Sequence, residues 1–541
     1  MALTKKPYFG FTGGWLTFWV SLACATDMTL FGYDQGVFSG VVVTPDFLQV
    51  HDLAGPSKTK ILSTVTAIYD VGCFFGAMLA FTAGERLGRK KTILLGCTIM
   101  AIGTILKASS YSLAQIVGNG LSTATAPVWQ TETAQAKWRG KLVILELGLN
   151  VGGYCLVNWI NYGLSLHEGG IVWRLPIALQ LCFIMILFTT IPWLPESPRW
   201  LLSHDRDDEA IEVLACIDAM SPEDPYIRTQ YDEIKYSIAY ERENAIPWRD
   251  LIRNKSDSTK TLRRLLLGAS TQAIQQFQGP PSVNPCIYPL PTSYPLTSHP
   301  RPGINIMSYY LPTVLISSVG LDNSMARLLT ACNATSYFIF SCVAVTMIER
   351  FGRRGLMLLS GSGQFLSFLV ITILLRFAET DKVYGTASVA FFFLYHVAFG
   401  IGMLGVPWLY PTEINSLPMR TKGAAVATAT NWMTNFAIVE ITPIGIQNIG
   451  WRFWIVWTVL NAVFLPIIYF LYPETANRTL EDIDLYYRSN PPLIVTKDPD
   501  AISAKRPLKY VQREDEEVRK RAKDAQGFAT KSDGASVEHY N

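Results

Sequence analysis

Charged residues are scarce in this sequence. Asp, Glu, Lys and Arg make up 16% of its 541 residues, against about 25% in a typical soluble protein. Hydrophobic residues reach 49%, and the mean hydropathy is positive. The composition therefore predicts a membrane protein with the lipid bilayer as its surroundings. The formal net charge is only +3, which gives no strongly basic surface for a nucleic acid.

The sequence also lacks the patterns of disulfides, metal centres and enzymes. Its nine cysteines have no paired spacing, so we expect neither a disulfide framework nor a metal site. The six histidines are isolated, and no Gly-x-x-x-x-Gly-Lys phosphate loop is present to drive a pump. We predict no cofactor and no enzyme activity. A cleavable signal peptide is not expected, because Lys5 and Lys6 lead into a full-length apolar segment.

Long apolar segments account for most of the chain. A segment of about 20 apolar residues is long enough to cross a bilayer as a helix. Twelve segments are predicted, at residues 14–42, 61–83, 91–108, 112–131, 141–163, 171–194, 262–315 with an interruption, 325–347, 355–376, 386–411, 421–444 and 450–472. The expected fold is therefore an all-α membrane protein with twelve transmembrane helices.

Basic loops indicate the orientation of these helices. Residues 84–91 and 349–354 are rich in Arg and Lys, and short loops of this kind stay in the cytoplasm. Both termini are then cytoplasmic as well. The predicted regions are a cytoplasmic N-terminus at 1–13, a six-helix half at 14–196, an intracellular linker of short amphipathic helices at 197–260, a second six-helix half at 261–487, and a disordered cytoplasmic tail at 488–541.

The two halves repeat the same charged motifs with the same spacing. The matched pairs are Glu85–Arg89 with Glu349–Arg353, Glu132–Arg139 with Glu413–Arg420, and Pro195–Glu196 with Pro473–Glu474. Two repeated halves around a site near the middle of the membrane are a known transporter design. The repeat therefore predicts two pseudo-symmetric halves and a transport function.

Asp34 lies towards the end of the first apolar segment, where a carboxylate is costly unless it faces a partner or a wet cavity. Gly32, Gly36 and Gly40 share one helix face and allow a neighbouring helix to come close. Asp34 is either an incidental polar residue in a packed interface or a proton or substrate site, and we favour the second interpretation. Asp27, two turns earlier, is either a relay for Asp34 or a polar residue set against a neighbouring helix.

Seven motifs occur in order along the chain. They are Gly-Tyr-Asp-Gln-Gly at 32–36, Gly-Glu-Arg-Leu-Gly-Arg-Lys at 84–90, Pro-Val-Trp-Gln-Thr-Glu at 127–132, Pro-Glu-Ser-Pro-Arg-Trp-Leu at 195–201, Glu-Arg-Phe-Gly-Arg-Arg at 349–354, Pro-Trp-Leu-Tyr-Pro-Thr-Glu at 407–413, and Tyr-Pro-Glu-Thr-Ala-Asn-Arg-Thr-Leu-Glu at 472–481. Together they resemble the sugar porter family of the major facilitator superfamily, particularly its fungal members. The resemblance covers roughly residues 14–487 and implies the major facilitator fold.

The resemblance implies transport of a sugar by alternating access, with a monosaccharide favoured. Charged side chains on the cytoplasmic side then latch the two halves together and separate when the inside opens. The residues of this cytoplasmic gate are Glu85, Arg89, Glu132, Arg139, Glu196, Arg199, Glu349, Arg353, Glu413, Arg420 and Glu474.

The resemblance also implies positions that contact the sugar. They are Gln275, Gln276, Asn305, Trp408, Asn431 and Trp432. Glu146 joins them at a position where the family usually has Gln. Amides suit this role because they donate to and accept from hydroxyl groups without the desolvation cost of a charge. Asn333 and Tyr337 could line the same cavity, and a hydrogen bond between helices is the alternative role for each of these residues.

Asp34 matches the acid that proton-coupled members of the family carry, so we favour proton symport. The alternatives are uniport of a sugar or polyol, and a sensor that binds sugar without moving it. The expected partners are a small sugar or polyol and a proton. We expect a monomer in the plasma membrane.

Two stretches depart from the family pattern. Residues 279–302 contain eight prolines and separate Gln275 and Gln276 from Asn305, although proline disrupts a spanning helix. Before Gly118, several residues of the pattern are missing, among them the arginine that usually partners the acid of the first span. Our hypothesis is a retained intron at the first place and clipped codons at the second, and a genuinely diverged product is the alternative.

Overall fold

The computed structural model describes residues 7–41, 44–53, 71–76, 78, 86–110, 139–244, 247, 259–278, 312, 315, 321–378, 380–513 and 516. Within these ranges all regular secondary structure is helical. Several predicted features lie outside the described residues. They are Glu85, Glu132, Asn305, the span 112–131, most of the span 61–83 and the Pro-rich stretch 279–302.

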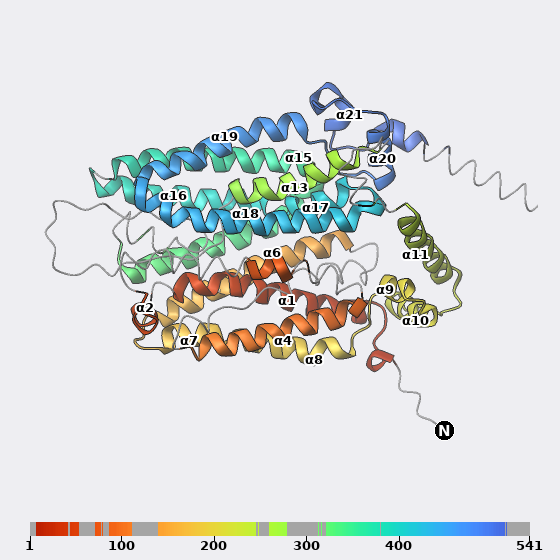
Figure 1. Ribbon diagram of the computed structural model, residues 1–541, viewed down its shortest axis with the longest axis horizontal. Helices are drawn as coiled ribbons and strands as arrows, with labels where there is room; N and C mark the ends of the chain where they lie inside the picture. Colours follow the sequence, from red (N-terminus) through yellow and green to blue (C-terminus); the bar gives the residue numbers. More distant parts are fainter. Residues whose placement is uncertain are drawn as a thin grey trace, which may run out of the picture.

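Five helices of the first half run side by side along the long axis of the molecule, in the lower part of Figure 1. They are α1 (Gly14–Val41), α4 (Arg89–Ala108), α6 (Arg139–Leu164), α7 (Ile171–Ala178) and α8 (Gln180–Thr190). The short α2 (Pro45–Val50) follows α1 at one end of this layer. The sixth predicted span is thus α7 and α8 in succession, continued by a 3-10 turn at Ile191–Trp193.

Glycines bring α1 and α6 into backbone contact. A Cβ atom added to Gly32 would lie 1.7 Å from the carbonyl oxygen of Asn150, and one added to Gly153 would lie 2.0 Å from that of Thr29. Any larger side chain would force the two helices apart, because a Cβ cannot come within 3 Å of a backbone atom. The predicted role of the α1 glycines in close helix packing is confirmed.

The second half forms the upper part of Figure 1. Its helices are α13 (Thr261–Gln278), α15 (Asn323–Phe377), α16 (Lys382–Ala398), α17 (Val406–Ile414), α18 (Arg420–Ile449) and α19 (Phe453–Leu471). A π-helical turn at Phe399–Met403 joins α16 to α17. The long α15 contains two predicted spans, which meet at Gly352, where φ is 75° and ψ is 171°.

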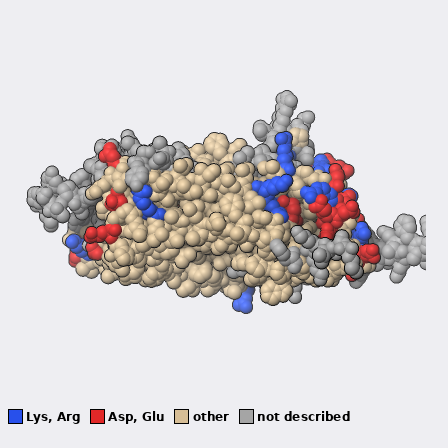
Figure 2. All heavy atoms as spheres, turned by 90° about the horizontal axis from the view of Figure 1, so that it is seen from below, with Lys and Arg blue, Asp and Glu red and all other residues tan. Residues whose placement is uncertain are grey.

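A broad uncharged band covers the middle of the face shown in Figure 2. In the face shown in Figure 2, most charged side chains gather at the two ends of the molecule, with tan atoms between them. By length and composition, five described helical stretches could cross a membrane. They are Arg89–Ala108, Ile171–Trp193, Asn323–Phe377, Lys382–Ile414 and Phe453–Leu471. Charged ends and an apolar middle are what a bilayer requires of a multi-pass protein.

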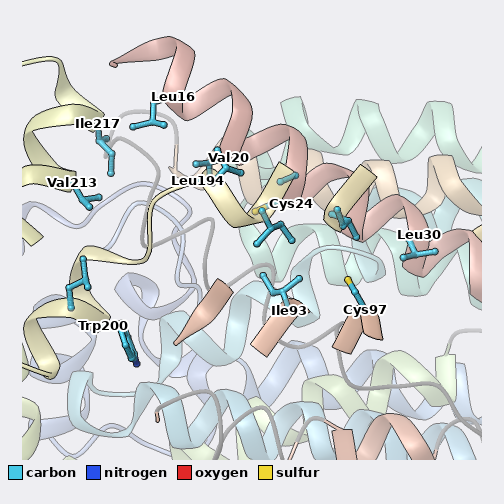
Figure 3. Close-up of a cluster of buried hydrophobic side chains, with 14 of the residues drawn as sticks. Leu16, Val20, Cys24, Leu30, Ile93, Cys97, Leu194, Trp200, Val213 and Ile217 are labelled. Atoms are coloured by element: carbon cyan, nitrogen blue, oxygen red, sulfur yellow. The ribbon is translucent and has the colours of Figure 1, made fainter. Parts of the chain in front are cut away.

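Three short helices follow the first half, as the sequence predicts for the linker. They are α9 (Pro198–Ser203), α10 (Asp207–Asp218) and α11 (Pro225–Glu243). Figure 3 shows how α9 and α10 attach to the first half through a buried apolar cluster. Trp200, Val213 and Ile217 pack there with Leu16 and Val20 of α1.

The structure differs from the sequence prediction just after residue 488. Residues 489–513 were expected to begin a disordered tail, but they include a 3-10 turn at Val495–Lys497 and the helix α21 (Pro499–Ile502). Val495 and Ala501 are fully buried against the second half. The carbonyl of Ala501 accepts a hydrogen bond from the amide of Glu474 at 2.8 Å. The hydrophobic periodicity of the sequence did not predict this ordered segment, because only a few buried residues attach an otherwise polar stretch to the second half.

Candidate functional site

Asp34 is buried between helices of the first half, with 4% of its surface exposed. Its Oδ1 accepts a hydrogen bond from Nε2 of Gln180 at 2.8 Å. Gln180 in turn accepts at Oε1 from the hydroxyl of Thr104 at 3.0 Å. The acid on α1 is thus tied to α8 and α4 by a chain of neutral polar groups. These hydrogen bonds fix the position of the carboxyl group among the three helices.

Gln180 and Thr104 are functional candidates that the sequence analysis missed. Gln180 stands at the first position of α8, just after the break that follows α7, and α7 contains Pro176. It was visible as a lone amide in the apolar run 171–194. Polar residues at such positions face the protein interior and need a partner. Nothing in the sequence identified Asp34 as that partner.

Gln275 and Asn431, two of the predicted sugar-contacting residues, form a hydrogen bond with each other in the second half. Asn431 donates from Nδ2 to Oε1 of Gln275 at 3.1 Å and to Oε1 of Gln272 at 2.6 Å. Gln275 and Gln272 donate to backbone carbonyls of the segment that joins α16 to α17 and of α17 itself, at Met403 and Pro407. Helices α13, α17 and α18 are therefore joined by one buried network of amides.

Backbone carbonyls become available to this network between the π-helical turn at Phe399–Met403 and α17, because Pro407 has no N–H to donate to the carbonyl of Met403. A π turn displaces the normal i to i−4 bonding, and such turns occur frequently at functional sites. The carbonyls of Met403 and Leu404 both accept from Nε2 of Gln275, at 2.7 and 3.2 Å. Ser360 adds a bond from the other side, since its hydroxyl accepts from the amide of Met403 at 3.2 Å.

The remaining predicted sugar positions have different surroundings. Trp432 is buried and meets Phe31 of α1 edge to face, with ring centroids 6.0 Å apart, so it bridges the two halves. Gln276 and Trp408 are half-buried. Glu146 is buried in α6, near Asp27 of the first half. Their contact with a sugar remains a prediction.

Asn333 is engaged within the second half. Its Nδ2 lies 2.9 Å from Nδ1 of the buried His396 on α16. Tyr337, one turn further along α15, meets Tyr154 of α6 edge to face at 6.4 Å. Asn333 therefore forms the interhelical hydrogen bond that was the alternative to a role in the cavity, while Tyr337 packs where the two halves touch.

Two glutamates at the end of the molecule that carries the linker helices cap helices in equivalent places. The carboxylate of Glu196 accepts from the amides of Arg89 at 3.0 Å and Lys90 at 3.2 Å. The carboxylate of Glu474 accepts from the amides of Arg353 at 2.8 Å and Arg354 at 3.1 Å. A carboxylate is stabilised at a helix N-terminus by unpaired N–H groups and the helix dipole.

These two caps refine the predicted gate. Arginine side chains were expected as partners of Glu196 and Glu474, and the structure adds backbone amides to that picture. A glycine precedes each cap, Gly88 with φ 87° and Gly352 with φ 75°. A Cβ added at Gly352 would lie 2.3 Å from Oε2 of Glu474. The repeated motifs of the sequence thus fold into the same local structure in both halves.

One predicted gate pair forms as an ion pair in the second half. Nη2 of Arg353 lies 2.7 Å from Oε1 of Glu413. Burial tends to lower the pKa of Arg353, but the carboxylates of Glu413 and Glu474 more than offset this and hold the pKa above its usual value. Arg199 instead pairs with Glu241 of α11, within the linker helices.

The other gate residues are exposed or lie outside the description. Glu349 and Arg420 are exposed. The backbone of Arg139 begins α6, but its side chain is not described. The ion pairs described on this side each join residues of one half or of the linker and tail next to it. The predicted latch between the two halves stays a prediction.

At the opposite end, Arg327 of α15 reaches across to the first half. Its Nη1 donates to the carbonyl of Asn161 on α6 at 3.4 Å, and its Nη2 lies 3.5 Å from the hydroxyl of Thr44. Arg327 is almost fully buried there. This contact joins the two halves at the end of the molecule that carries α2.

Comparison with known proteins defines the class. The fold is similar to that of XylE from E. coli, the proton:xylose symporter solved with bound 6-bromo-6-deoxy-D-glucose. The TM-score is 0.68 at 22% identity, over 87% of this chain and 99% of XylE. This likeness shows the fold, and the apolar helices agree with a multi-pass membrane protein. The family match and the relatives given next show a transporter of the major facilitator superfamily rather than an enzyme.

The chain belongs to the family described as "Sugar (and other) transporter", which matches residues 19–288 and 301–487. Residues 289–300 fall outside the match, within the Pro-rich stretch 279–302. The chain is 66% identical over 529 residues to the MFS-type transporter oryC of Aspergillus oryzae, covering 96% of this chain and 94% of that protein. It is 32% identical to the sugar transporter STL1 of Saccharomyces cerevisiae, over 90% of this chain and 84% of STL1.

Proposed function

We propose that this protein is a proton-coupled symporter that carries a sugar, with a monosaccharide favoured, across the plasma membrane by alternating access. The observation that carries the proposal is the buried acid Asp34, held by the neutral amide of Gln180. A carboxyl group in that setting can bind a proton from one side of the membrane and release it to the other. The names of the related STL1 and XylE support a sugar substrate and, for XylE, a proton partner.

The amide network of the second half supports the substrate class. Gln275 and Asn431 lie at one buried place between α13, α17 and α18, and their amides can exchange hydrogen bonds with sugar hydroxyls. Trp432 and Trp408 offer rings on which a sugar face can stack. We place the substrate between this network and the first half, with both termini in the cytoplasm.

Uptake in a yeast strain without its own hexose transporters tests the proposal. Cells expressing the wild-type protein should accumulate radiolabelled glucose or xylose above the external concentration, and a protonophore should abolish the accumulation. Asp34→Asn should lose uphill accumulation but keep exchange of labelled for unlabelled sugar. Undiminished accumulation in Asp34→Asn would exclude coupling through this acid.

Two alternatives give different results in the same strain. A uniporter would equilibrate the sugar or a polyol such as glycerol without accumulating it, and the protonophore would have no effect. A sensor would bind sugar and signal with no uptake at all. The cytoplasmic caps at Glu196 and Glu474 favour transport over sensing, because both halves keep the elements that a moving gate needs.

A further inference from the structure

Asp27 is a buried acid to which the proposed transport cycle gives no role. It lies in α1, two helical turns from Asp34, and only 3% of its surface is exposed. Neither of its carboxyl oxygens has a hydrogen-bond partner among the described residues. An ionised carboxylate without a partner is very costly in such a place, so a buried acid of this kind takes up a proton or a cation instead.

The groups around Asp27 supply no positive charge in the part of the chain that the structure describes. The titratable groups that interact with it electrostatically are Cys24 on α1, Cys97 on α4 and Glu146 on α6. Figure 3 shows Cys24 and Cys97 in the buried cluster where α1 meets α4. None of these three groups carries a positive charge that would stabilise an ionised Asp27.

The register between α1 and α6 sets Glu146 beside Asp27. The two helices run in parallel, with Gly32 against Asn150 and Ser39 donating to Oδ1 of Asn158 at 3.1 Å. Following this offset back towards the start of both helices brings Asp27 level with Glu146, which is itself only 2% exposed. Two carboxyl groups that interact in a buried site cannot both be ionised at little cost, so one of them keeps its proton.

We propose that Asp27, with Glu146 beside it, forms a proton-binding site distinct from Asp34. The proton resides on a carboxyl oxygen of Asp27, because this buried side chain has no hydrogen-bond partner among the described residues that would support its ionised form. Seven residues of helix separate Asp27 from Asp34, which is about 10 Å at the usual rise per residue. The two acids are therefore separate sites. The inference concerns where a proton lies in the protein and does not depend on which solute is carried.

Infrared difference spectroscopy of the purified full-length protein tests the proposal. A protonated carboxyl group gives a C=O stretching band apart from those of carboxylates, and deuteration shifts it. The wild-type protein should show this band at neutral pH, and Asp27→Asn should lose it. Asp34→Asn should keep it, which makes this variant the matched control. Glu146→Gln should also keep the band of Asp27, which separates it from any band of Glu146.

Two results would overturn the proposal: no protonated band in the wild-type protein at neutral pH, or a band that persists in Asp27→Asn. A band that disappears on adding Na⁺ at constant pH would also overturn it, since Asp27 would then hold a cation.

The thermal unfolding temperature shows whether Asp27→Asn folds as stably as the wild-type protein. Asp27→Asn should unfold at the wild-type temperature, because an amide replaces a neutral acid of the same shape, whereas a large fall would mean an ionised, paired Asp27. Failure of sugar uptake would leave these spectra unchanged, so the two proposals can fail separately.

Discussion

The side chain of Gln180 donates a hydrogen bond from Nε2 to Oδ1 of Asp34 at 2.8 Å. The two residues come from α8 and α1 and are both buried. Since Thr104 orients the amide of Gln180 from α4, the acid has a defined position among three helices. The rotation of this one amide decides whether Asp34 meets a donor or an acceptor.

Replacing Gln180 should therefore impair proton coupling. Gln180→Leu removes a hydrogen bond to a carboxylate, which is worth about 1.5–3 kcal/mol. The carboxyl group of Asp34 loses that support, so sugar accumulation should fall. Initial uptake rates across a pH series provide the measurement. Thr104→Val, which removes only the group behind Gln180, should have a smaller effect, and an equal or larger one would contradict this order.

Gly352 should not tolerate a side chain. Its φ of 75° is strained for other residues, at about 1–3 kcal/mol, and an added Cβ would lie 2.3 Å from the carboxylate of Glu474. We expect Gly352→Ala to lower the unfolding temperature in detergent and to reduce the amount of folded protein. Gly355→Ala is the control, because the nearest atom to its Cβ would be 3.8 Å away. Equal stability of the two variants would show that the cap does not support the fold.

Variants of Asn431 and Gln276 should distinguish a structural role from a sugar-binding role. Asn431→Ala leaves the amide oxygens of Gln272 and Gln275 without their donor, and each unsatisfied group costs about 1–3 kcal/mol. Both stability and uptake should fall. Gln276 is half-buried in the same helix, so Gln276→Ala should raise the KM for sugar and leave the unfolding temperature unchanged. A stability loss in Gln276→Ala would remove it from the binding site.

His51 should make the end of the molecule with α2 sensitive to acid. Its Nδ1 lies 3.0 Å from the carbonyl of Phe47, and its Nε2 lies 3.0 Å from the hydroxyl of Ser110. Burial lowers the pKa of His51 and Arg174 adds to this, while the Phe47 carbonyl and Asp46 act in the opposite direction.

The lowered pKa means that the folded protein favours the neutral ring. Its contribution to stability is complete above the usual histidine pKa of about 6.5 and is lost as the pH falls through the lowered value. The wild-type unfolding temperature should thus drop on acidification, and less so in His51→Gln. The exposed His167 is the control, since His167→Gln should follow the wild-type curve. Identical pH dependence in all three proteins would exclude His51 as the cause.

The messenger RNA should lack the codons for residues 279–302. The family match is interrupted at 289–300, within this stretch. Amplification across the codons for 270–312 in mature transcript, with genomic DNA as the control, should give a product shorter by that stretch. A product of genomic length would establish the Pro-rich stretch as part of the protein. The same reaction across 105–135 tests the predicted gap before Gly118.

The sequence was sufficient to predict most helices and the symmetry of the halves. Apolar length and paired charges depend on local spacing, so the position of α15 and the equivalence of Glu196 and Glu474 could be read directly. Hydrogen-bond partners that are distant in sequence could not be predicted in this way. Gln180 is 146 residues from Asp34, and only the folded arrangement of α1 and α8 joins them. For the same reason the sequence did not identify Gln272 as a member of the amide network, because spacing along the chain does not distinguish Gln272 from Gln275.

The backbone contact between α1 and α6 couples chemistry in one part of the molecule to geometry in another. Because the backbones of α1 and α6 touch at Gly32 and Gly153 with no flexible side chain between them, we expect the two helices to move together as one rigid unit. This unit contains Asp34 on α1 and, further along α6, the Asn161 carbonyl that accepts a hydrogen bond from Arg327 of the other half. A displacement of α1 at Asp34 would therefore reach the seam between the halves through the helix backbones themselves, without any relay of intermediate side chains.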